Sequence, residues 1–192
     1  MQLQYLQEKP MSELTIFNDS DIQADTQSSI FNSTDSLEIK EQLHKVGVTF
    51  ETWDTYQVDV NNTDAVLYAY KADLDRIQGS GGYQTVDVIS LDKGNPNAAM
   101  MRAKFLFEHQ HSEDEVRFFV KGEGLFCLHI GEKVFQVLCT QGDLICVPAN
   151  TKHWFDMGSD PMFTAIRFFN NEAGWVANST ESDIATKFPL LD

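Results

Sequence analysis

The pattern of hydrophobic and polar positions divides the chain into two parts. Residues 11–107 alternate between helical and extended patterns, whereas residues 108–170 form a nearly continuous series of short apolar segments with a period of two. Turn residues at 131–133 and 141–143 separate these segments at regular intervals. Such a series is typical of a β-sandwich or barrel. We therefore expect a mostly β protein whose helices pack outside a barrel.

Periodicity and capping residues predict where the individual elements begin and end. Asp35 with Glu38 forms a capping pair, and Asn95 with Pro96 suits the start of a short helix. The segment 18–34 is rich in Asn, Asp, Ser and Thr and is expected to be a loop. Predicted helices span 35–46, 63–78 and 95–107, and predicted strands span 14–17, 48–53, 85–91, 116–120, 125–130, 134–138, 144–147, a stretch from 154, and 163–169, with a turn at 121–124.

Length and charge limit the classes of protein that need to be considered. A chain of 192 residues suits one domain, which we expect to span residues 11–192, with a barrel core at about 83–170 and residues 1–10 as a flexible extension. The formal net charge of −15 disfavours binding to nucleic acid and to anionic membrane surfaces. No apolar run approaches the length of a membrane span.

The cysteines and the N-terminal residues predict a cytoplasmic protein. Cys127, Cys139 and Cys146 are odd in number and lie in apolar stretches, which indicates buried thiols rather than disulfides. The first residues lack the positive cluster and apolar core of a secretory signal.

One polar segment, residues 108–117, contains the residues that suggest chemistry. His109 and His111 are two residues apart, so in an extended chain they point to the same face, as do the odd-numbered residues that follow them. Parity alone does not choose between Glu113 and Glu115. Imidazole with carboxylate suits Fe(II), Ni(II), Mn(II) or Zn(II), and in a barrel the downstream His153 can join the first pair. A solvated charged strand with incidental histidines is the plainer alternative.

These residues also carry a family resemblance. The spacing of His109, His111, Glu115 and Gly122 resembles the first cupin motif, and that of Gly142, Pro148 and His153 resembles the second. The stretch EHQHSEDEVRFFVKGEGLFCLHIGEKVFQVLCTQGDLICVPANTKHWFDMG strongly resembles the bacterial acireductone dioxygenases of methionine salvage, and the resemblance runs from Met11 to the C-terminus. It implies a cupin-type double-stranded β-helix, that is, a jelly-roll barrel.

The resemblance also implies roles for individual residues. The metal ligands, for one Fe(II) or Ni(II) per chain, would be His109, His111, Glu115 and His153. Arg117 would stabilise the substrate anion, Glu108 and Asp114 would play supporting parts in catalysis, and Phe105, Phe155 and Trp175 would surround the substrate. By contrast, His129 is expected to be structural or exposed.

The reaction implied by the family uses a small acireductone and O2. The substrate is 1,2-dihydroxy-3-keto-5-methylthiopentene, from which the iron form yields 4-methylthio-2-oxobutanoate and formate, and the nickel form yields 3-methylthiopropionate, CO and formate. Bacterial members suggest a monomer. Two alternatives stay open, namely another cupin metalloenzyme and a non-catalytic cupin that binds a metal or ligand. Asn150 and Met157 depart from the second cupin motif, which leaves the geometry of that loop open.

Overall fold

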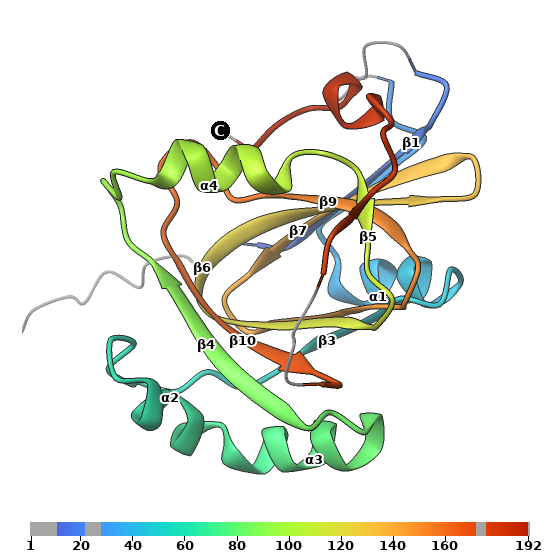
Figure 1. Ribbon diagram of the computed structural model, residues 1–192. Helices are drawn as coiled ribbons and strands as arrows, with labels where there is room; N and C mark the ends of the chain where they lie inside the picture. Colours follow the sequence, from blue (N-terminus) through green and yellow to red (C-terminus); the bar gives the residue numbers. More distant parts are fainter. Residues whose placement is uncertain (1–10, 22–27, 172–175, 192) are drawn as a thin grey trace, which may run out of the picture.

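The strands of the computed structural model form a jelly-roll barrel, seen in Figure 1. The structure describes residues 11–21, 28–171 and 176–191, so the expected extension at residues 1–10 lies outside the described residues. All strand pairs are antiparallel, and they form two sheets that share one long strand, β6 (Glu115–Ile130). The first sheet has the order β11 (Asn178–Ser179), β5 (His109–Gln110), β9 (Lys152–Asp156), β6, β7 (Lys133–Thr140), β1 (Glu13–Asn18), β2 (Phe31–Ser33). The second has the order β4 (Thr85–Leu91), β10 (Phe163–Phe169), β6, β8 (Asp143–Val147), β3 (Thr49–Thr52).

Strand β6 is the element that closes the barrel. We expected two strands separated by a turn at 121–124, which is wrong, because β6 runs through this segment without a break. Its register against β10 shifts between Thr164 and Ala165, and Gly122 has a φ of +73°. A bulge and a glycine with positive φ let a strand bend sharply while it keeps its hydrogen bonds. As a result, the first part of β6 pairs with β8 and its second part pairs with β7.

The helices lie outside the barrel, as predicted. Helix α1 (Ser36–His44) begins at the predicted cap, where Asp35 accepts hydrogen bonds from the Leu37 and Glu38 amides. Helix α4 (Ala98–Phe105) occupies the predicted third helical segment but begins later than Asn95. A short 3-10 helix, η1 (Ile184–Lys187), follows β11 near the C-terminus.

The predicted helix 63–78 is in fact two helices, α2 (Thr63–Ala69) and α3 (Lys71–Gly81). The break falls at Tyr70, whose φ and ψ of −100° and 12° are not helical. Its side chain is fully buried, its ring packs edge-on against Phe118 of β6, and its hydroxyl accepts the Tyr56 amide. Packing of this one side chain outweighs the helical periodicity of the sequence around it.

Three apolar clusters hold the layers together. The barrel interior is filled by large side chains such as Phe119, Phe126 and Val137. Helices α2 and α3 cover the outer face of the second sheet, where Leu74 packs near Phe168. The C-terminal segment covers the first sheet, with Phe188 against Trp154. Strands β6, β9 and β10 are covered on both faces, which explains why most of their residues are buried.

Two short strands and one boundary differ from the expectations. Strand β2 lies within the segment 18–34 that we expected to be a loop, and β11 was not predicted. Strands β1 and β3 also extend the two sheets beyond the expected core at 83–170. Among the described residues, no helix is long and apolar enough to cross a membrane.

Candidate metal centre

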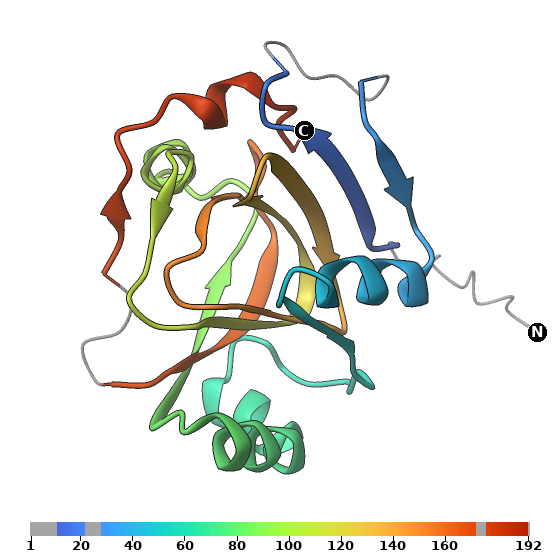
Figure 2. The same cartoon turned by 90° about the vertical axis from the view of Figure 1, so that its right-hand side faces the viewer.

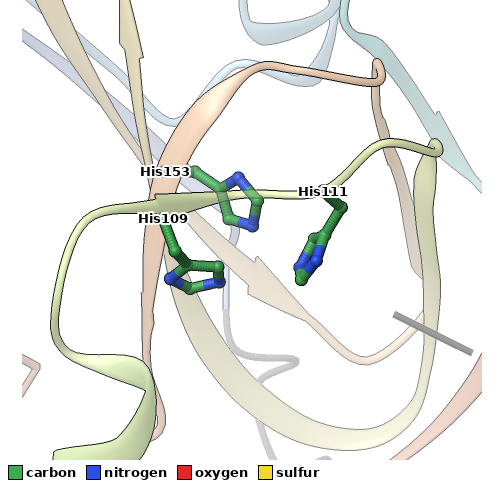
Figure 3. Close-up of side chains that lie close together, drawn as sticks. All are labelled: His109, His111 and His153. Atoms are coloured by element: carbon green, nitrogen blue, oxygen red, sulfur yellow. The ribbon is translucent and has the colours of Figure 1, made fainter. Parts of the chain in front are cut away.

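Three histidines meet at one end of the barrel. His109 of β5 is paired in register with His153 of β9, and His111 follows β5 in the chain. One ring nitrogen from each lies within 4.8 Å of the others, and Figure 3 shows the three rings turned toward a common point. All three side chains are buried. The structure therefore brings together the three histidines that the sequence singled out.

Backbone carbonyls determine which nitrogen of each ring faces the centre. The Nδ1 atoms of His109, His111 and His153 lie 2.8, 2.9 and 2.8 Å from the carbonyl oxygens of Phe107, Val176 and Thr151, respectively. A carbonyl oxygen only accepts, so each Nδ1 donates its proton and each Nε2 presents a lone pair to the centre. This arrangement is typical of histidines that bind metals.

Glu115 supplies a carboxylate to the same point. Its Oε2 lies 2.9 Å from Nε2 of His153 and 3.4 Å from Nε2 of His111. Two lone pairs so close repel each other unless a cation, either a proton or a metal, lies between them. Neighbouring ligands are about 3 Å apart around a cation whose bonds to nitrogen and oxygen are about 2.1 Å. The distances from Glu115 Oε2 to His153 and His111 thus suit ligands of a single divalent metal.

Burial and neighbouring charges shift the pKa values of His109 and Glu115 toward the protonation states that a metal requires, whereas His111 is shifted the other way. Burial, reinforced by His153, lowers the pKa of His109 to about 4. Burial alone raises the pKa of Glu115, but the charge of Arg117 and the close approach of His111 and His153 hold that pKa well below its usual range. Burial also lowers the pKa of His111, but the hydrogen bond and charge of Glu115 outweigh it, so the net shift is upward.

Arg117 links the centre to a large cavity. It lies two residues beyond Glu115 on β6, is 8% exposed, and donates to Oε1 of Glu115 at 2.8 Å. Its guanidinium also lies over the ring of Phe155, 4.4 Å from the centroid. The cavity holds about 870 Å³ and is lined by both groups together with His109, His111 and Glu115. A cavity of this size suits a small organic ligand.

The apolar wall of the cavity comes from several elements. Phe105, at the end of α4, and Phe155 of β9 both line it, as expected. Trp175 lies outside the described residues, so the structure does not place it. Further apolar side chains complete the wall: Ile89, Met101, Phe107, Met157, Phe163 and Phe169.

Glu108 and Asp114 do not line this cavity. The Glu108 carboxylate accepts hydrogen bonds from His129 and Thr180 on the opposite face of β5. Asp114 accepts the hydroxyl of Tyr83 and the amide of Ala149. Both carboxylates therefore hold the segment that carries His109 and His111 to its surroundings. Glu113, which parity alone could not separate from Glu115, is bound by Asn171 instead.

A second charged pair at the cavity was not predicted from the sequence. Arg167 of β10 lies opposite Arg117 of β6 in register and binds Asp87 of β4 with two hydrogen bonds of 2.9 and 2.6 Å. Lys104 of α4 lines the cavity as well. The sequence offered only one indication of this pair, the single arginine within the apolar segment FTAIRFF. Its partner Asp87 is 80 residues away in the chain, so the pairing could not be read from the sequence.

Asn150 departs from the second cupin motif, yet its backbone adopts the conformation that a glycine usually provides there. It has a φ of +62°, in the left-handed region, and its amide donates to the His111 carbonyl at 2.7 Å. Asn is the residue, after Gly, that adopts this conformation most readily. The loop that leads into β9 and His153 therefore keeps the turn that a glycine usually provides.

A jelly-roll barrel with three histidines and a glutamate converging beside its cavity defines a cupin-type metal centre. The model of the ARD/ARD' family matches residues 13–177 of the chain. Acireductone dioxygenases of Cronobacter sakazakii and Synechococcus sp. (strain RCC307) are 54% and 50% identical over 183 residues, which is 94% of this chain and 99% of each relative. This chain therefore belongs to the ARD/ARD' family.

A solved structure is similar over nearly the same range. The acireductone dioxygenase from Bacillus anthracis, with a cadmium ion in its active center, superposes with a TM-score of 0.73. It is 29% identical, and the match covers 87% of this chain and 97% of that one. The similarity supports the cupin fold that the sequence predicted.

Proposed function

We propose that this protein is a metal-dependent dioxygenase that cleaves an acireductone, 1,2-dihydroxy-3-keto-5-methylthiopentene, with O2. The observation that carries the proposal is the convergence of His109, His111, His153 and Glu115 beside a cavity of about 870 Å³ that also contains Arg117. Metal ligands, a fixed cation and an apolar wall are together what an anionic substrate with a thioether tail requires.

The four converging side chains are the proposed ligands of one Fe(II) or Ni(II). Both metals accept imidazole and carboxylate ligands, and no thiolate lies among the four to favour another metal. When bound there, the metal supplies a Lewis acid and a template that holds two neighbouring oxygens of the substrate. The carbonyls that orient the three Nδ1 atoms prepare the ligands before the metal binds.

Arg117 is the proposed partner of the substrate anion. A guanidinium carries several N–H donors in one plane. Arg117 donates one of them to Glu115, and its guanidinium remains beside the cavity. Its positive charge favours the deprotonated enediolate, which is the electron-rich form that reacts with O2. The ring of Phe155 beneath it and the carboxylate of Glu115 hold it in place.

Phe105, Phe155 and Trp175 are proposed to exclude water and to contact the methylthio tail. Phe155 is 3% exposed and packs against Phe126 and Phe163, so its position is firmly held. Phe105 is only half-buried at the end of α4. Sulfur and aromatic rings make favourable contacts, which suits a thioether substrate.

Glu108 and Asp114 are proposed to support catalysis from a distance. Their carboxylates bind protein groups outside the cavity, so their contribution is to position the segment between them, which carries His109 and His111. Contact with the substrate is not part of this role.

The metal that is bound decides the proposed products. With Fe(II) the enzyme forms 4-methylthio-2-oxobutanoate and formate, and with Ni(II) it forms 3-methylthiopropionate, CO and formate. In both cases the two atoms of O2 enter the products, so the atoms balance without another oxidant.

We also propose that residues 11–192 form one domain that acts as a monomer in the cytoplasm. The convergence of His109, His111, His153 and Glu115 needs no residue of a second copy, which supports an active monomer. The described cysteines are free thiols, and Cys127 and Cys139 are buried, which suits a reducing compartment.

The test is oxygen uptake by protein loaded with one metal at a time. Metal-free protein is reconstituted anaerobically with Fe(II) or Ni(II), mixed with the acireductone, and exposed to O2 while uptake and products are followed. We expect consumption of one O2 per substrate and a product set that changes with the metal. Metal-free protein and the His109→Ala variant are the controls. Tight metal binding without oxygen uptake would contradict the proposal and indicate a cupin that only binds metal.

A further inference from the structure

The residue next to the ligand His109 has an unusual environment. Successive side chains of a strand point to opposite faces, so Glu108 points away from the cavity that His109 faces. Its carboxylate is only 1% exposed. A buried carboxylate is costly unless both of its oxygens are hydrogen bonded, so the groups that bind Glu108 matter for the position of this segment.

Two groups from distant parts of the chain bind the Glu108 carboxylate. Nδ1 of His129, on β6, donates to Oε1 at 2.5 Å. The hydroxyl of Thr180, just beyond β11, donates to Oε2, and the Thr180 amide donates to the Glu108 carbonyl at 3.1 Å. Glu108 is thus held between a barrel strand and the C-terminal segment, which runs along β5 in Figure 2.

The strand that carries His109 has little other support. Strand β5 contains two residues, and it pairs with β9 through His109 and His153. On its other side it pairs with the two residues of β11. Such a short strand gains its precise position from side-chain contacts at its ends. The Val176 carbonyl, which orients His111, comes from the same C-terminal segment.

We propose that His129 and Thr180 are positioning residues for the metal: through Glu108 they hold His109 in the orientation in which it binds the metal. The C-terminal segment 176–180 therefore contributes to metal affinity although none of its side chains is a ligand. This inference rests on the assignment of His109 as a ligand under the proposed function. Loss of a group that supports a metal ligand weakens metal binding by about 10–100-fold in comparable sites.

Matched pairs of variants test the proposal. His129→Leu removes the donor to Glu108, whereas His129→Asn keeps an N–H near the position of Nδ1. Thr180→Val removes the hydroxyl with little change in shape, whereas Thr180→Ser keeps it. Thr186→Val is the control, because Thr186 donates to the Asp183 carbonyl at 2.7 Å in the same C-terminal region without reaching Glu108.

The measurements are made without substrate. The dissociation constant for Ni(II) alone is obtained by competition with a chelator, the absorption spectrum of the Co(II)-loaded protein reports the ligand geometry, and urea unfolding of the metal-free protein reports stability. We expect about 10–100-fold weaker Ni(II) binding and an altered Co(II) spectrum for His129→Leu and Thr180→Val. The Asn and Ser variants should restore both, and Thr186→Val should resemble the wild type.

Two results would overturn the proposal. One is a Leu or Val variant that is less stable but binds Ni(II) with wild-type affinity and spectrum, because the contacts would then serve only the fold. The other is equal weakening by the Asn and Leu variants, because the hydrogen bond to Glu108 would then not be the cause. Failure of the ligand assignment itself is separate, since it would show as wild-type Ni(II) binding by His109→Ala.

Discussion

The Arg117 guanidinium and the Glu115 carboxylate, two residues apart on β6, form an ion pair with a distance of 2.8 Å between Nη2 and Oε1. The pair joins the two halves of the site, because Glu115 faces the histidines with its other oxygen while Arg117 faces the cavity. One consequence concerns pH. Arg117 helps to hold the pKa of Glu115 well below its usual range, against the effect of burial.

Replacement of Arg117 should therefore make metal binding more sensitive to acid. In Arg117→Met the pKa of Glu115 rises, so protons compete with the metal at a higher pH, and the midpoint for metal release moves upward. The check is the Ni(II) content of protein dialysed at a series of pH values. Arg76→Met, which removes an exposed ion pair with Glu51, should leave the midpoint unchanged. A midpoint that stays in place or moves downward in Arg117→Met would contradict the role of Arg117.

Removal of a proposed histidine ligand should have a larger effect than removal of a supporting group. We expect His109→Ala to bind Ni(II) or Fe(II) at least ~100-fold more weakly than the wild type, at or beyond the upper end of the range for lost supporting hydrogen bonds. Metal analysis after reconstitution and gel filtration measures this directly. His44→Ala is the matched control, because His44 is exposed at the end of α1. Full metal content in His109→Ala would refute the ligand assignment.

Replacement of Phe105 should mainly affect substrate binding, whereas replacement of Phe155 should mainly affect stability. Phe155 lies in the core, so Phe155→Ala should cost about 3–5 kcal/mol of unfolding free energy. Phe105 is half-buried on α4, so Phe105→Ala should cost only about 1 kcal/mol while it raises KM for the acireductone. Urea unfolding and steady-state oxygen uptake give the two quantities. An unchanged KM in Phe105→Ala would remove this residue from the proposed pocket.

The bend in β6 should tolerate no side chain at Gly122. A Cβ atom there would lie 1.8 Å from the Met162 carbonyl oxygen, and the φ of +73° adds strain. Together, the left-handed conformation and the clash should destabilise Gly122→Ala by about 2–5 kcal/mol. Gly131 has a similar φ of +64° but no atom within 4 Å of its Cβ position, so Gly131→Ala should cost only about 1–2 kcal/mol. Equal losses in urea unfolding would show that conformation, not space, limits Gly122.

The cysteines should resist alkylation in the folded protein. Burial raises the pKa of Cys127 and Cys139, and it raises the pKa of the more accessible Cys146 to about 11. At pH 8 a thiol of that pKa is roughly 0.1% thiolate, which is the reactive form. Mass spectrometry after a short treatment with iodoacetamide should find unmodified protein, and the same treatment in urea should label all three cysteines. Rapid labelling of folded protein would contradict the burial of these thiols.

Local sequence determined many of the elements and the identity of the site. Asp35 caps α1 because a side-chain oxygen there can reach two amides, and period-two alternation indicated the barrel strands. The motifs that contain His109 and His153 placed the proposed ligands at positions that the structure brings together. These signals are readable because they act over a few residues, within reach of one side chain or one turn.

Tertiary packing decided what depends on contacts between distant residues. Tyr70 interrupts a helical pattern because its ring is needed beside Phe118, and β6 continues through Gly122 because a bend there lets one strand serve two sheets. Parity alone left Glu113 and Glu115 equivalent, and the fold selected Glu115 by placing His153 beside it. The groups that bind the outward-facing Glu108 carboxylate, His129 and Thr180, likewise come from distant parts of the chain. Sequence thus determined which chemical groups are available, whereas the closure of the barrel decided which of them meet, because only folding brings residues far apart in the chain within bonding distance.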